Sequence, residues 1–401
     1  MKALVVLENH FYVDEDDNVW CDRIVDYGYL KRYLQVFDKI VVAGRAKKES
    51  KKLCANKLRV LGENVEFVSL PDFVGARGIL KNRKRIKNIL KTVINDVDCV
   101  IYRAPTHLSI FTYKEVLKQN TILIFEFMMA ADKMFDGNSI VSKIFNKVID
   151  YAVKKMILKA NGVSYVTDYT LQKKYPSRFI KYDDNKCIYG NYSSIDLTKE
   201  LFYEQKWNRD IVPSRFKIIH TGYMDSYRKG QDILIKALKI VVDKGYDNVV
   251  LEFIGDGVKK NEFMSLAKRL DLEDKIIFKG LVSSKKEIID ELKSSNLFVF
   301  PTTSEGLPRS LIEAMAVGLP CISSPVDGIP ELIDSDYLVA QDDVEGYANL
   351  IIYFIENWGE CIEIGRKNYL KSLNYEKSII DKKRNDFYLK IKERVEDNEK
   401  K

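Results

Sequence analysis

The chain has 401 residues, of which 46% are hydrophobic and 31% are charged, and its formal net charge is +7 at pH 7. This balance is typical of a globular protein and excludes a disordered chain. A chain of this length favours two domains of ordinary size. The longest apolar stretch, 121–131, is interrupted by Glu126, so no stretch of the sequence approaches the ~18 apolar residues of a membrane span.

The N-terminus and the cysteines both indicate a cytoplasmic protein. The first apolar run ends at Glu8, which makes it too short for the core of a secretory signal. The cysteines contain no CxxC pair, so we predict reduced, buried thiols and neither a zinc site nor a disulfide framework. They are Cys21, Cys54, Cys99, Cys187, Cys321 and Cys361.

Short β-rich runs recur along the chain, and most of them are continuously apolar, as in strands of a parallel sheet that is covered on both faces. In the first half they lie at 2–8, 38–44, 65–70, 98–104, 121–127 and 162–167. In the second half they lie at 216–222, 249–255, 275–280, 297–301 and 320–324. Segments with helical spacing, such as 230–245 and 261–270, lie between them. We therefore predict strand–helix–strand units in two doubly wound α/β domains.

The strand rhythm breaks in the polar stretch 193–216. We place one domain at 1–200 and a second at 210–375. Ligands of open α/β sheets gather at the carboxyl ends of the strands, so we expect the site at strand ends, in the cleft where two such sheets face each other. A dinucleotide cofactor is disfavoured, because the first predicted strand is not followed by a GxGxxG turn.

The segment SEGLPRSLIEAMAVGLP, 304–320, is predicted to be a loop followed by an apolar helix. Pro308 suits a first helical turn, where its missing N–H is not needed. The free N–H groups of such a turn attract anions, and Gly306 lets a phosphate come close. Glu305 would lie beside that phosphate. Glu313 lies on a helix with little other polar surface, where a carboxylate is costly unless it is paired. Alternatively, Glu305 only caps the helix and Glu313 faces water.

Glu305 and Glu313 match the E-x7-E motif of the retaining nucleotide-sugar glycosyltransferases of family 4. The resemblance extends over 216–333 and includes a glycine turn with Lys-Gly and a helix (220–238) and two further strand ends (251–257 and 276–282). It implies the GT-B fold, in which two Rossmann-like domains face each other across a cleft. It also implies that the first domain binds the acceptor, the second binds the donor, and a last helix at 376–401 crosses back to the first domain.

The resemblance also implies roles for single residues. Glu313 would hold the ribose of the donor, and Glu305 would face the donor sugar as a catalytic residue. Lys229, with Arg228 beside it, would neutralise the departing diphosphate, so no metal or other cofactor is expected. The donor-binding residues predicted in this way are Gly222, Arg228, Lys229, Gly255, Gly280, Leu281, Val282, Glu305, Gly306, Leu307, Pro308, Arg309, Ser310 and Glu313. Many family members have arginine where this chain has Tyr223; either Arg228 replaces that charge or the second cation is absent.

Members of this family commonly place a histidine on the acceptor side of the cleft. His107 follows the predicted strand 98–104 and is the best candidate for this catalytic position. His10 is the second candidate, and a structural role is the alternative for both. His220 is expected to pack in the core. Residues 7–45 resemble the opening of enzymes that build bacterial surface polysaccharides.

The segment KNRKRIKNILK, 81–91, contains six basic residues among eleven, interleaved with Ile86, Ile89 and Leu90 at helical spacing. A basic amphipathic helix can lie on an anionic membrane surface, so peripheral association with the inner face of the membrane is a further expectation. The alternative is a solvated helix face.

These features together predict a retaining glycosyltransferase that moves a sugar from a UDP- or GDP-sugar to a glycan or lipid-linked glycan in bacterial surface polysaccharide synthesis. One alternative is a nucleotide-sugar epimerase of related fold, which needs no acceptor. Another is a non-catalytic nucleotide- or glycan-binding protein, whose motif is expected to be broken. Nucleic-acid binding is not expected, because the positive charge is accompanied by no recognition motif.

Overall fold

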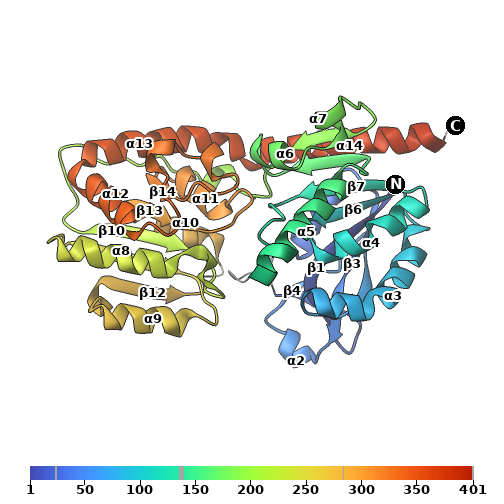
Figure 1. Ribbon diagram of the computed structural model, residues 1–401, viewed down its shortest axis with the longest axis horizontal. Coiled ribbons are helices and arrows are strands. Elements are labelled where there is room, and N and C mark those ends of the chain that lie inside the picture. The colour runs from blue at the N-terminus through green and yellow to red at the C-terminus, as the bar shows by residue number, and fades with distance from the viewer. Residues whose placement is uncertain (23–24, 135–139, 283, 400–401) are drawn as a thin grey trace. The chain divides into compact units, whose positions relative to one another are not determined.

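The computed structural model describes residues 1–22, 25–134, 140–282 and 284–399. These residues form two compact units, shown in Figure 1. Unit 1 consists of residues 1–192 and 381–401, and unit 2 of residues 193–380. The chain leaves unit 1 after Tyr192, at the start of the polar stretch, and returns to it within helix α14 (Lys377–Glu399).

Unit 1 is built on a mixed sheet whose parallel strands follow the order β5-β3-β1-β6-β7-β8-β9. The order reverses direction between β1 and β6, as in a doubly wound sheet. These strands are β1 (Lys2–Val13), β3 (Lys39–Lys48), β5 (Val65–Pro71), β6 (Cys99–Ala104), β7 (Ile122–Phe127), β8 (Gly162–Tyr165) and β9 (Ile188–Asn191). Two short antiparallel strands, β2 (Val19–Cys21) and β4 (Leu58–Arg59), extend the end of β1.

Two layers of helices cover this sheet. One layer contains α3 (Gly75–Ile94), α4 (His107–Lys118) and α5 (Ile140–Ile157), with α4 in contact with both neighbours. The other contains α1 (Tyr27–Leu34) and the unit 1 part of α14. Side chains alternate along a strand, so Tyr102 of β6 reaches Thr112 of α4 while the next residue, Arg103, faces α1. Shorter helices are α2 (Lys51–Cys54), α6 (Thr170–Lys174) and α7 (Arg178–Tyr182).

The carboxylate of Glu126 on β7 is buried at the centre of unit 1. It accepts hydrogen bonds from the hydroxyls of Tyr33 (2.9 Å), Tyr192 (3.3 Å) and Tyr388 (2.7 Å). Arg103 Nε lies 3.8 Å from the same carboxylate. A buried charge is costly unless it is paired and hydrogen-bonded, and here both conditions are met. Because Tyr388 belongs to α14, this network attaches the last helix to the sheet of unit 1.

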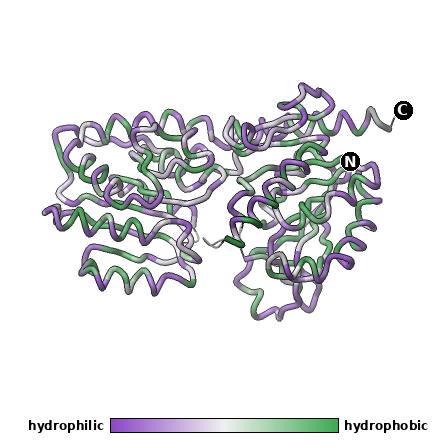
Figure 2. The backbone as a smooth tube through the Cα atoms, in the orientation of Figure 1, coloured by the Kyte–Doolittle hydropathy of each residue, from purple (hydrophilic) through white to green (hydrophobic). Residues whose placement is uncertain are grey.

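Unit 2 is built on a parallel sheet of five strands in the order β12-β11-β10-β13-β14. They are β10 (Phe216–Thr221), β11 (Val249–Ile254), β12 (Ile276–Gly280), β13 (Leu297–Phe300) and β14 (Cys321–Ser323). One layer contains α8 (Gln231–Asp243), α9 (Lys260–Arg269) and α12 (Val344–Glu356); the other contains α10 (Lys285–Lys293), α11 (Arg309–Ala316) and α13 (Trp358–Ser372). In each unit the strands are mostly apolar and the helices carry many hydrophilic stretches (Figure 2).

The predicted α/β fold class is confirmed, and each predicted strand is present with small changes at its ends. Strands β2, β4 and β9 were not predicted, and β1 runs on to Val13. All six cysteines are buried and none forms a disulfide, as predicted. No helix among the described residues is both long and apolar enough to span a bilayer.

Candidate functional site

Three loops meet at the carboxyl edge of the sheet of unit 2. The N–H of Gly222, after β10, donates to Ile254 O at 2.9 Å, and the N–H of Gly255, after β11, donates to Gly280 O at 2.9 Å. Gly255 has φ +143°, and a Cβ there would lie 2.0 Å from Gly222 O. Only glycine fits such a close approach. Three of the predicted donor-binding glycines therefore lie together at one edge of the sheet.

Lys229 and Glu305 form a hydrogen-bonded ion pair at the same edge. Lys229 ends the short helix η2 (Tyr227–Lys229) after β10, and Glu305 lies in the loop after β13. Thr302 Oγ1 lies 3.0 Å from Glu305 Oε1. The Lys229 Nζ atom is 5.1 Å from the centre of the Phe300 ring, close enough for a cation–π contact. Two residues predicted to be catalytic, 76 positions apart in the chain, are thus in direct contact.

Backbone hydrogen bonds hold the loop that carries Glu305. The N–H of Glu305 itself donates to Asp327 Oδ2 at 2.9 Å, and Gly328 N–H donates to Gly306 O at 2.9 Å. On the other side, Thr303 N–H donates to Arg228 O at 2.9 Å. Asp327 was not predicted as a site residue. Its signal was the Asp-Gly pair shortly after a strand, which is typical of a turn.

Glu313 lies on α11 among buried neighbours, and its own side chain is half-buried. Burial raises the pKa of Glu313, and the charges of Arg309 and Lys285 act to lower it. No hydrogen bond joins its carboxylate to another group in the part of the chain that the structure describes. Burial lowers the pKa of Lys285, and Glu313 opposes that shift. Lys285 was missed by the sequence analysis, because nothing in its surroundings at 283–287 distinguishes it from other surface lysines.

Helix α11 begins at Arg309, one residue later than predicted. Pro308 is the residue before the helix and has an extended backbone (ψ 118°), so it is not in the first turn. The first backbone bond runs from Ile312 N–H to Pro308 O at 3.3 Å. The N–H groups of 309–311 therefore have no carbonyl partner within the helix, and they form an anion-attracting end.

The other predicted donor-binding residues surround this edge. Gly306 and Leu307 lie in the loop between Glu305 and α11, and Ser310 is in the first turn of α11. Leu281 and Val282 follow β12, and Leu281 is exposed. Arg228 and Tyr223 are both exposed on the loop that carries Lys229. Arg228 and Lys229 are thus neighbouring cations on the loop that carries Tyr223, and the replacement of the missing arginine by Arg228 stays a prediction.

His220 is fully buried at the end of β10, as expected for a core histidine. Its Nδ1 lies 3.0 Å from Val299 O, and a carbonyl only accepts, so Nδ1 carries the hydrogen. Burial lowers the pKa of His220 to about 4. The ring packs against Phe253 and Phe300 and is neutral at pH 7.

In unit 1, both remaining histidines face carboxylates: Glu8 lies within β1, and Asp72 directly follows β5. His107 is the first residue of α4, and its Nδ1 lies 2.8 Å from Glu8 Oε1, while Leu108 N–H donates to Glu8 Oε2 at 2.9 Å. Burial acts to raise the pKa of Glu8, but the hydrogen bond and charge of His107 outweigh it and the pKa is lowered. His10 Nδ1 lies 2.8 Å from Asp72 Oδ1. The sequence analysis missed both carboxylates.

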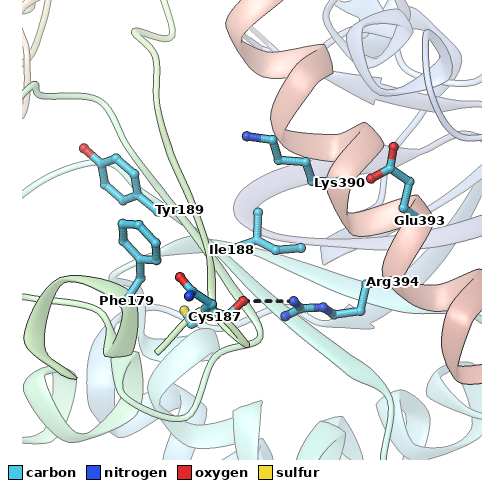
Figure 3. A pocket seen from close by; sticks show the side chains of 8 residues that line it. Phe179, Cys187, Ile188, Tyr189, Lys390, Glu393 and Arg394 are labelled. Atoms are coloured by element: carbon cyan, nitrogen blue, oxygen red, sulfur yellow. Dashed lines mark hydrogen bonds between the residues drawn. The ribbon is translucent and has the colours of Figure 1, made fainter. Parts of the chain in front are cut away.

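A separate cavity of about 410 Å³ lies in unit 1 between α7, β9 and α14 (Figure 3). The rings of Phe179 and Tyr189 stack at its edge, 5.5 Å apart, and Arg394 donates to Asn185 O at 3.0 Å across it. None of the predicted site residues lines this cavity.

Residues 204–371 match the model of the family "Glycosyl transferases group 1". These residues form a glycosyltransferase group 1 domain. The match lies within unit 2 and includes Lys229, Glu305 and Glu313. The predicted enzyme class, a glycosyltransferase, is therefore confirmed, and the epimerase and the non-catalytic protein lose their support.

The similarity extends beyond this domain. Protein CapJ of Staphylococcus aureus is 27% identical over 95% of this chain and 94% of its own length. The amylovoran biosynthesis glycosyltransferase AmsK of Erwinia amylovora is 27% identical over 42% of this chain and 44% of its own. Anabaena HepE, solved with UDP and glucose, superimposes with a TM-score of 0.67 at 17% identity, over 95% of this chain and 97% of that one. The structural likeness confirms the predicted GT-B fold.

Proposed function

We propose that this glycosyltransferase belongs to family 4, uses a UDP- or GDP-sugar donor, retains the anomeric configuration, and extends a glycan or lipid-linked glycan of a bacterial surface polysaccharide in the cytoplasm. The observation that carries the proposal is the Lys229–Glu305 pair at the strand ends of unit 2, with Glu313 eight residues further on. AmsK, named for amylovoran biosynthesis, supports the polysaccharide, and HepE, solved with UDP-glucose, supports the donor class.

In this proposal Glu313 binds the ribose of the donor. An ionised carboxylate can accept from two neighbouring hydroxyls, and the Glu313 carboxylate is hydrogen-bonded to no described residue. Arg309 and Lys285 favour its charged form against the cost of burial. Hydrogen bonds from the ribose would stabilise the same charged form.

Lys229, Arg228 and the N–H groups at the start of α11 would hold the diphosphate. As the bond from the anomeric carbon to the diphosphate oxygen breaks, negative charge grows on that oxygen and Lys229 stabilises it. The acceptor hydroxyl attacks from the same face and passes its proton to the departing diphosphate. Glu305 stabilises the positive charge on the sugar. These cations replace a metal ion in the proposal, so turnover should survive EDTA.

We propose that unit 1 binds the acceptor. His107 is the residue that would contact the reacting sugar, and Glu8 orients its ring through the 2.8 Å contact to Nδ1. His10, held by Asp72, is the second candidate for the same contact.

The experiment that tests the proposal is a thermal-shift screen with UDP, GDP, ADP and TDP and their sugars, repeated with EDTA. A ligand at 100 times its dissociation constant adds about 2.7 kcal/mol of stability. We expect UDP or GDP to stabilise the protein and Glu313→Gln to lose the shift. Turnover of the matching donor should depend on added acceptor, and NMR should show a product with the donor's anomeric configuration. No shift with any nucleotide, or turnover without acceptor, would contradict the proposal.

A further inference from the structure

The basic helix at 81–91 does not present the amphipathic face that its sequence predicts. It forms the middle of α3, where Ile86 and Leu90 are fully buried in unit 1 and Ile89 is half-buried. The basic residues point outward, and most are exposed. The segment 81–91 therefore offers positive charge to a membrane but no fully exposed apolar side chain, and Leu80 is the exposed large apolar residue of the described part of α3. The role of α3 in membrane binding stays a prediction, and a larger apolar contact has to come from elsewhere.

The layer of α3, α4 and α5 is far more basic than the rest of the protein. These three helices contain thirteen Lys and Arg residues and two acidic residues, a formal excess of +11, whereas the whole chain carries +7. The rest of the chain is thus net negative. Both acidic residues are already paired: Glu115 with Lys87 and Lys118, and Asp150 with Lys154. The positive charge is gathered on one side of the sheet of unit 1.

Helix α5 adds an exposed apolar surface to this layer. Six large apolar side chains along it are between 53 and 77% exposed, at intervals of one, three and four residues. We call them the α5 ridge: Ile140, Val141, Ile144, Phe145, Val148 and Tyr151. The opposite side, with Val153, Met156 and Ile157, is buried in unit 1. A surface helix normally hides its apolar stripe in the core, so an outward stripe of this length indicates a binding surface. Figure 1 shows α5 at the edge of its layer.

Lysines accompany the ridge along its length. At 100° per residue, Lys143, Lys147 and Lys154 lie along one flank of the ridge, and Lys155 lies in line with it. Their aliphatic stems can lie against apolar surface while the ammonium groups reach lipid phosphates. An apolar face bordered by lysines is the pattern of a helix that lies in the plane of a membrane interface.

We propose that the α5 ridge inserts into the headgroup region of an anionic lipid bilayer, with the basic faces of α3 and α4 held above the lipid phosphates. Charge complementarity selects this occupant. A second copy of the chain, docked through the same layer, would bring +11 against +11. The anionic surface of a membrane attracts each lysine or arginine of the layer that comes within about one Debye length of it. The inference does not depend on the proposed function, because the binding needs neither donor nor acceptor.

Sedimentation of the full-length protein with vesicles tests the proposal. We expect binding to vesicles that contain phosphatidylglycerol, little binding to pure phosphatidylcholine, and weaker binding at high salt. Ile144→Asp/Val148→Asp should weaken the partition at least tenfold, and each neutralised lysine in Lys143→Gln/Lys147→Gln should weaken it roughly fivefold. The matched controls are Val258→Asp, an exposed valine of unit 2, and Lys382→Gln/Lys383→Gln on α14. If the control variants bind the vesicles as weakly as the ridge variants do, the proposal is overturned.

A fluorescent label gives a readout that does not depend on a destabilising change. All six native cysteines are buried, so a polarity-sensitive thiol dye will react at Val148→Cys. The dye should shift to the blue with phosphatidylglycerol vesicles, whereas the same dye at Val258→Cys should not shift. If the labelled protein binds the vesicles but the emission of the dye at position 148 does not shift, the ridge is not in contact with lipid. The alternative outcome is that the protein self-associates in the absence of lipid. If it does, and if Ile144→Asp/Val148→Asp abolishes that self-association, a second copy of the chain is the occupant of the ridge and the proposal is overturned.

Discussion

Glu305 is held by three groups before any substrate is bound. Lys229 and Thr302 contact its carboxylate, and Asp327 accepts from its N–H. In the proposed reaction a diphosphate competes with Glu305 for Lys229. Once the diphosphate has taken Lys229, the negative charge of Glu305 is no longer neutralised by that lysine. It can then stabilise the positive charge that develops on the sugar. The pair would thus hold the Glu305 carboxylate in place until the donor arrives.

Changing Glu305 to glutamine should mainly lower kcat, whereas changing Glu313 to glutamine should mainly raise KM. Glu305→Gln removes charge that matters in the transition state, so we expect kcat to fall by roughly 10²–10³ with little change in KM. Glu313→Gln removes charge that binds the ribose, so we expect KM to rise roughly ten- to a hundredfold with kcat nearly intact. Steady-state kinetics with the identified donor separates the two. Glu345→Gln, an exposed change on α12, should alter neither. Equal loss of donor affinity in both variants would remove the catalytic role of Glu305.

His220 should make the stability of the protein depend on pH between 6.5 and about 4. Its folded pKa, lowered by burial to about 4, lies below the ordinary value of 6.5. The unfolded chain therefore takes up a proton below pH 6.5 while the folded chain does not. Stability is highest above pH 6.5 and falls by up to about 1.4 kcal/mol per pH unit as the pH drops towards 4.

Urea unfolding at pH 7, 6 and 5 measures this dependence. His220→Phe should be less stable than the native protein at pH 7, because the hydrogen bond to Val299 O is lost, but its stability should fall less between pH 7 and pH 5. His10→Gln, at a partly exposed position, serves as the control. An unchanged slope in His220→Phe would show that another group titrates.

At the scale of elements, the loops after β10 and β13 are joined tightly enough to need glycine. Gly230 has φ +74°, and a Cβ there would lie 2.0 Å from Pro301 O. It comes directly after Lys229 and directly before α8. The fit of Gly230 against Pro301 therefore sets the distance from Lys229 to Glu305.

Gly230→Ala should be more costly than Gly245→Ala. Both glycines have positive φ, but a Cβ at Gly245 would meet nothing within 4 Å. We expect about 1 kcal/mol of backbone strain in Gly245→Ala. Gly230→Ala should lose roughly 1–3 kcal/mol more, because the clash with Pro301 is added. It should also weaken the donor-induced thermal shift, whereas Gly245→Ala should leave it unchanged. Equal stabilities in urea would show that the loops shift apart without cost.

The elements were predictable where the pattern is local. Runs such as 216–222 and 249–255 are apolar throughout, and only strands buried on both faces tolerate that pattern, so β10 and β11 were predicted correctly. β4 has two residues, both exposed, and carries no such pattern. The E-x7-E spacing pointed to Glu305 and Glu313 because both lie within one loop and helix. Glu8 and His107 are 99 positions apart, and only the sheet brings them together. The sequence of α5 resembles that of an ordinary core helix, and only the burial of its side chains shows that the α5 ridge is exposed.

At the scale of the whole molecule, α14 belongs to two units. Its first residues lie in unit 2, where Lys377 N–H donates to Leu197 O at 2.7 Å. Further along, Phe387, Tyr388 and Ile391 are buried in unit 1 against Glu126, Gly162 and Gly190. The stability of unit 1 therefore depends on the last part of the chain.

Tyr388→Phe should destabilise unit 1 by about 1–2 kcal/mol, because it removes one of three hydroxyls from a buried carboxylate. Hydrogen exchange should show faster opening in β7 and α1 and unchanged protection in β10 and β11. Tyr353→Phe, on an exposed part of α12, is the matched control and should have no effect. If Tyr388→Phe leaves the exchange of β7 unchanged, the hydroxyl of Tyr388 does not stabilise the network.

The double use of α14 also determines the order in which a ribosome can complete the two cores. Residues 193–380 are inserted within unit 1, so all of unit 2 emerges before the segment with Phe387, Tyr388 and Ile391. A nascent chain can finish the sheet of unit 2 while Glu126 still lacks the hydroxyl of Tyr388. The part that is translated first is therefore the part that is completed last. A chain that ends between residue 371 and Phe387 would keep the whole segment that matches the glycosyltransferase group 1 model, beside a unit 1 whose core is unfinished.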